Sequence, residues 1–162
     1  MIFGSSRDCK TLLHIRRELL QDVVEQEILY YAIDLESTKD NIYGEAEIKM
    51  YWQPVRLTCL IKRGDQQWKV DEFGPDLNRV TSFAFVKEDF KDLNFKPSVG
   101  DVICWSNHYF ECDGIKENQL FLGKDEDYRL DPNRTHKFGE SVSIVCQTHL
   151  TRYTKLNIVN YN

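Results

Sequence analysis

The chain of 162 residues lacks any apolar run near the roughly 20 residues that a transmembrane helix needs. Its first ten residues also lack the long apolar stretch and the cleavage pattern of a signal peptide. Its five cysteines are odd in number and widely spaced, which disfavours a disulfide framework. We therefore expect no membrane association, synthesis in a cytoplasm and reduced thiols.

The motifs of a cofactor or metal site are also missing. Gly123-Lys124 lacks the upstream glycine of a phosphate-binding loop. Cys104, His108 and Cys112 are spaced four apart, but the chain has no close Cys-x-x-Cys or His-x-x-x-His pair. A hairpin with a two- or four-residue loop would point the two cysteines to opposite faces of a sheet, which favours buried thiols over zinc.

No local arrangement suggests catalysis. The four histidines form no Ser/His/Asp or Cys/His set by spacing, and the acidic run near residue 125 lacks the alternating ligands and central glycine of a calcium loop. The 21 basic and 26 acidic residues give a net charge of −5, which argues against broad nonspecific nucleic-acid binding. A local contact through Arg152 and Lys155 stays open. We expect no enzyme activity, no cofactor and no metal.

What is present favours one mainly β domain over residues 1–162. Apolar residues near helical spacing predict an amphipathic helix over 7–24, which either covers its own core or docks a partner. From Glu27 the period changes to two, and the first strand is apolar on both faces, so another element or another chain should cover one of them. Residues 87–93 predict a short second helix.

The remaining pattern predicts a β core over 27–149. We expect a half-buried strand over 46–52, a loop over 71–79, a hairpin around Ser106-Asn107-His108, a long loop over 123–140 and a polar tail over 150–162. Pro54 marks a sheet edge or a strand start. Short strands separated by turns indicate a small antiparallel β-barrel or sandwich.

Several segments together resemble the neck proteins of contractile-tailed, T-even-related bacteriophages. In chain order they are Asp22-Val23-Val24-Glu25, Tyr30-Tyr31, Asn41-Ile42-Tyr43-Gly44-Glu45-Ala46, Phe73-Gly74-Pro75-Asp76, Val99-Gly100-Asp101-Val102-Ile103, Glu117-Asn118-Gln119-Leu120-Phe121-Leu122-Gly123-Lys124 and Thr148-His149-Leu150-Thr151-Arg152. They span roughly residues 20–160. The resemblance implies a virion structural protein, a head-to-tail connector that closes the DNA-filled head and offers a docking surface to the tail.

The resemblance also implies partners. We expect a ring of copies of this chain, six- or twelvefold, between portal or adaptor proteins and tail-terminator proteins, close to packaged DNA. The family carries no catalytic residues, so the candidate site residues are partner contacts, namely Tyr30, Tyr43, Asp125, Asp127, Arg134, Arg152 and Lys155. Two alternatives stay open, a tail-terminator or baseplate subunit and a small-barrel binding module or enzyme.

Overall fold

The computed structural model describes residues 6–40, 46–71, 74–117, 120, 141–152, 156 and 158. The chain begins with helix α1 (Ser6–Glu18), which continues into a π-helical segment, η1 (Leu19–Val24). A short helix, α2 (Lys87–Asp92), lies in the second half of the chain. Both predicted helices are confirmed. The strands among the described residues are β1 (Glu27–Tyr31), β2 (Lys39–Asp40), β3 (Ala46–Ile48), β4 (Val55–Thr58), β5 (Leu60–Asp71), β6 (Gly74–Val86), β7 (Val102–Trp105), β8 (His108–Lys116) and β9 (Ser143–Thr151).

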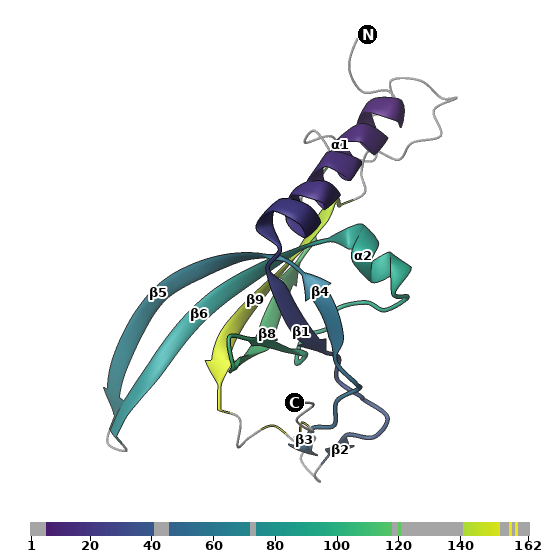
Figure 1. Ribbon diagram of the computed structural model, residues 1–162. Coiled ribbons are helices and arrows are strands. Elements are labelled where there is room, and N and C mark those ends of the chain that lie inside the picture. Colours follow the sequence, from purple (N-terminus) through teal and green to yellow (C-terminus); the bar gives the residue numbers. More distant parts are fainter. Residues whose placement is uncertain are drawn as a thin grey trace.

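Seven of these strands form one antiparallel sheet in the order β4-β1-β7-β8-β9-β6-β5, and β2 pairs with β3 in a small second sheet. The prediction of a mainly β fold is therefore confirmed. Hydrogen bonds do not close the large sheet into a barrel. Its two edge strands, β4 and β5, are separated only by Cys59, so the sheet must curl until its edges meet at this residue (Figure 1). Pro54 directly precedes the edge strand β4, as its residue type predicts.

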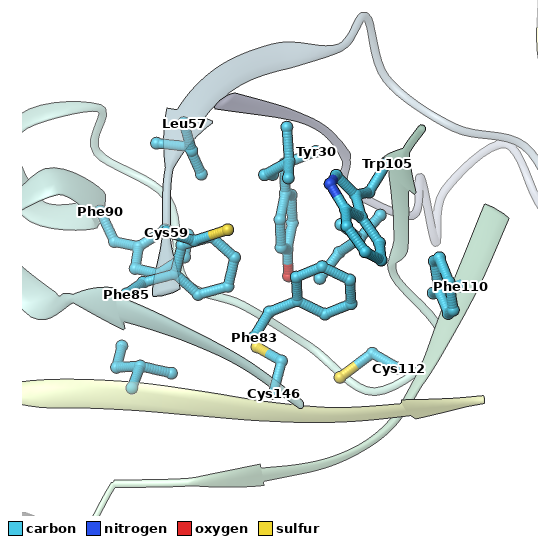
Figure 2. Close-up of a cluster of buried hydrophobic side chains, with 13 residues drawn as sticks. Tyr30, Leu57, Cys59, Phe83, Phe85, Phe90, Trp105, Phe110, Cys112 and Cys146 are labelled. Atoms are coloured by element: carbon cyan, nitrogen blue, oxygen red, sulfur yellow. The ribbon is translucent and has the colours of Figure 1, made fainter. Parts of the chain in front are cut away.

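The concave side of the sheet encloses an aromatic core (Figure 2). Phe83 packs edge-on against Phe110 and Trp105, with ring centroids 5.5 and 6.3 Å apart. Phe90 of α2 packs in the same way against Phe85, at 5.2 Å. Helix α2 therefore covers one part of the core. Each fully buried side chain of this size contributes about 1.5–3 kcal/mol through removal of apolar surface from water.

The opposite face of β1 is also covered. Tyr31 and Val102 are buried in a second cluster with Leu156 and Ile158, which belong to the C-terminal segment. Ile28 and Tyr30 belong instead to the main core. The prediction that another element covers one of the two apolar faces of this strand is confirmed, and Leu156 and Ile158 provide that cover.

The hairpin predicted around residue 107 is confirmed in detail. Strands β7 and β8 are joined by Ser106 and Asn107, whose φ values of 51° and 60° are those of a type I′ turn. The two-residue loop places Cys104 in the outer cluster and Cys112 in the main core. The two thiols therefore lie on opposite faces of the sheet, as the strand geometry predicts.

Two predicted boundaries are wrong. The expected loop over 71–79 is mostly strand, because β5 extends to Asp71 and β6 begins at Gly74. The loop was expected because Gly74-Pro75-Asp76 is typical of a turn, but the pairing of β5 with β6 continues through these residues. The expected strand over 46–52 ends at Ile48, and Trp52 is 59% exposed because nothing among the described residues covers it.

Candidate assembly surfaces

The outer half of the β5–β6 hairpin forms an arm that projects from the sheet (Figure 1). Residues 66–71 pair with residues 74–79, while strand β9 pairs with β6 only from Val80 onward. The arm is therefore a two-stranded ribbon about 20 Å long, at about 3.3 Å per residue. Within the described chain, neither of its outer edges has a strand partner.

A two-stranded ribbon is marginally stable in water by itself, and its unpaired N–H and C=O groups can accept another strand. Pro75 pairs with Val70. Proline lacks a backbone N–H, so it removes one hydrogen-bond donor from the ribbon, which is tolerated at the edge of a sheet. The two edges belong to different strands, β5 and β6. One edge of a copy can therefore meet the other edge of the next copy, which is a heterologous contact.

At the other end of the molecule, α1 projects away from the sheet (Figure 1). The apolar side chains Leu12, Ile15, Leu19 and Val23 form a stripe along it, and they are 41%, 50%, 49% and 76% exposed. We call these four residues the α1 stripe. Two roles were predicted for the helix. Side chains that cover the core of their own chain would be buried, so the exposure of the α1 stripe matches a docking element better. Leu20, which is 8% exposed, is the buried apolar residue of the segment.

The base of α1 is fixed to α2 by charge. The Arg17 guanidinium contacts Asp89 at 3.1 Å and donates a hydrogen bond to Asp92 at 2.7 Å. Burial raises the pKa of Asp89, and the charge of Arg17 opposes that rise. The hydrogen bond to Asp92 raises the pKa of Arg17. These contacts orient the helix without covering its stripe.

The segment around Gly100 joins three parts of the sheet. The buried Asp101 carboxylate accepts hydrogen bonds from the Tyr30 hydroxyl (2.7 Å), the Ile33 N–H (2.8 Å) and the Ser98 N–H (2.6 Å). Gly100, with φ of 95°, lets the backbone turn so that its N–H donates to the Cys112 carbonyl at 2.9 Å. Burial raises the pKa of Asp101 despite these donors. The arrangement is a structural joint between β1, β7 and β8.

Two cations stack on one aromatic ring beside the arm. The guanidinium carbons of Arg63 and Arg79 lie 4.8 and 5.4 Å from the centre of the Trp105 ring. Cation–π contacts of this kind contribute about 0.5–1 kcal/mol at exposed positions. They connect the base of the arm to the β7–β8 hairpin.

The thiols of the core have the electrostatics of buried groups. Burial raises the pKa of Cys59 to about 12. A hydrogen bond between Cys112 and Cys146 lowers the pKa of Cys112 and raises that of Cys146. All three side chains are at most 1% exposed. Such thiols are packing groups, because a reactive cysteine needs access as well as a thiolate.

The structure places two of the seven predicted contact residues. Tyr30 is 1% exposed and holds Asp101, so its observed role is in the core. Arg152 is exposed just beyond the end of β9. A partner contact by either one stays a prediction. The other five lie outside the described residues, namely Tyr43, Asp125, Asp127, Arg134 and Lys155.

Sequence reasoning missed the arm and named no residue of the α1 stripe as a contact. The spacing of the stripe was visible in the sequence, but its exposure was not, because an amphipathic helix more often covers its own core. Among the residues that the structure describes, no group of three His, Cys, Asp or Glu side chains could hold a metal ion. No helix in the described ranges is long and apolar enough to cross a membrane.

Comparisons with known proteins give one structural likeness to report. No protein-family model matches the chain, and no curated protein matches it. Among solved structures, the chain is similar to a chain from a structure described as "Virion of native gene transfer agent (GTA) particle". The TM-score is 0.44 and the sequence identity 8%, over 78% of this chain and 94% of that chain.

Proposed function

We propose that this chain is a structural protein of the virion neck in a contractile-tailed bacteriophage. In this role, copies form a ring between the portal or adaptor proteins and the tail-terminator proteins. The ring closes the DNA-filled head and presents a surface on which the tail docks. The ordered set of motifs that resembles phage neck proteins supports the role, and the arm is the observation that supports assembly.

The arm supplies the geometry that a ring needs. Its two unpaired edges are different surfaces on one ribbon, so each copy can offer β5 to a neighbour and receive another neighbour on β6. Contacts of this kind close into a ring when the rotation between neighbours allows it. The net charge of −5 suits a passage through which DNA moves without binding tightly.

The experiment removes the outer arm and leaves the body intact. Gln66 and Arg79 are direct partners, so an Asn-Gly turn in place of residues 67–78 keeps the register of the remaining hairpin and the Arg79 contact with Trp105. Wild type mixed with the portal and tail partners should form annuli in negative-stain images. The shortened variant should remain folded by circular dichroism but form none.

A matched control changes the other projection. The double substitution Ile15→Gln/Leu19→Gln alters two exposed side chains of α1 and leaves the arm unchanged. This variant should still form annuli. Wild type that stays monomeric with every partner, or a shortened variant that assembles normally, contradicts the proposal. A position at the tail tip or baseplate in images of the intact particle would favour the tail-terminator or baseplate alternative.

A further inference from the structure

The α1 stripe is an apolar surface on a helix that extends away from the sheet, and its neighbouring charges indicate what covers it. We infer that two copies of the free chain pair through α1, with the two helices antiparallel and the two stripes facing each other. The occupant of the stripe is therefore the same stripe of a second copy.

The charge along the projection is divided into two halves. Residues 7–17 carry four basic side chains and one acidic side chain, while residues 18–25 carry three acidic side chains and no basic one. The basic set is Arg7, Lys10, Arg16 and Arg17, and the acidic set of the second half is Glu18, Asp22 and Glu25. An antiparallel pair places each basic half beside an acidic half. A parallel pair places like charges together, which is unfavourable.

The stripe itself has the spacing of a helix-packing surface. Its members follow one another at intervals of three, four and four residues, so they stay on one side over three turns. The contact of Arg17 with α2 leaves this side open. Pairing removes from water the side chains that the fold leaves exposed, which is the driving force for association.

Ends of opposite charge then meet across the pair. Arg7 lies in the first turn of α1, and Glu25 directly follows η1 at the other end of the helical segment. Both are exposed, and they lie on either side of the stripe along the helix. In the antiparallel pair, Arg7 of each copy lies beside Glu25 of the other, so the contact occurs twice.

This pairing goes beyond the proposed neck role. A contact between two identical surfaces joins two copies and stops, whereas neighbours in one cyclic ring meet through different surfaces. Pairing through α1 is thus a property of the free protein, and the ring would use the arm instead. The two proposals fail separately, because the tests use different surfaces and different preparations.

The first test measures the mass of the purified full-length chain over a dilution series, by analytical ultracentrifugation. Wild type should be a dimer that dissociates on dilution. Ile15→Gln/Leu19→Gln should raise the dissociation constant at least about 100-fold, since four apolar side chains of the pair become polar. The control Leu60→Gln/Val80→Gln changes exposed apolar side chains of β5 and β6 and should leave the constant unchanged.

The second test decides the orientation. Arg7→Glu alone and Glu25→Arg alone should each weaken the dimer about 10-fold, because each creates two like-charge contacts. An equal mixture of the two variants should recover wild-type affinity, since the mixed pair has two opposite-charge contacts. A monomeric wild type, a dimer that survives the stripe substitutions, or a mixture without recovery overturns the inference.

Discussion

The joint at Asp101 gives the sharpest stability prediction, through the substitution Asp101→Asn. The carboxylate accepts three hydrogen bonds, two from backbone N–H groups of Ile33 and Ser98 and one from the Tyr30 hydroxyl. An amide has only one accepting oxygen. The Tyr30 hydroxyl can rotate to accept a bond from the new NH₂ group, but one of the two backbone N–H groups loses its acceptor in either orientation of the amide.

The size of the effect follows from that lost acceptor. A buried donor without a partner costs about 1–3 kcal/mol, and we expect the free energy of unfolding to fall by about 2 kcal/mol at neutral pH. Urea denaturation followed by tryptophan fluorescence measures this value. Tyr30→Phe should cost less, about 1 kcal/mol, because both backbone donors keep the carboxylate. Asp113→Asn at an exposed position is the control and should change stability by less than about 0.5 kcal/mol.

The pH dependence has a defined sign. Burial raises the pKa of Asp101 in the folded chain, so the folded state holds this proton more tightly than the unfolded state. The stability from protonation is fully present below the ordinary carboxyl pKa and is lost as pH rises through the raised value. The advantage of wild type over Asp101→Asn should therefore shrink as pH rises across this window. An Asn variant as stable as wild type, or an advantage that grows with pH there, would refute the reasoning.

Three other perturbations follow from the same structure. Gly100→Ala should lower the free energy of unfolding by about 1–2 kcal/mol in urea denaturation, because φ is 95° there while the added Cβ meets only the Ile33 Cδ1 at 3.6 Å. Phe83→Ala should cost about 3–5 kcal/mol in the same assay, since it opens a cavity among Trp105 and Phe110. Arg17→Ala should speed amide hydrogen exchange in α1 and lower the free energy of unfolding by about 1–3 kcal/mol, because it leaves the buried Asp89 carboxylate without its cation, whereas Asp92 is exposed. Unchanged exchange in α1 would mean that α2 does not hold the helix.

Part of the fold could be predicted because local chemistry determines it. Ser106 and Asn107 lie between two apolar strands, and a two-residue turn there fixes the register and the opposite faces of Cys104 and Cys112. Strand β1 shows its two buried faces as an apolar run in the sequence. The amphipathic period of residues 7–24 likewise predicted the helical segment.

The rest depends on contacts between distant segments. Strand pairing carries β5 and β6 through residues 66–79, but Gly74-Pro75-Asp76 is typical of a loop, so part of the arm resembled a loop in the sequence. The position of α1 depends on Arg17 meeting a helix more than 70 residues later, which no local pattern shows. Leu156 and Ile158 appeared to be part of a polar tail, although they cover β1. The barrel-or-sandwich prediction left open how the edges meet, which is settled by the single residue between β4 and β5.

A neck ring joined through the edges of the arms can be seen directly by cryo-electron microscopy of the intact phage particle. Density for this chain should form an annulus between the portal and the tail, with β5 of each arm hydrogen-bonded to β6 of the next. Density for the chain elsewhere in the particle, or an annulus in which both edges of every arm remain unpaired, would contradict it.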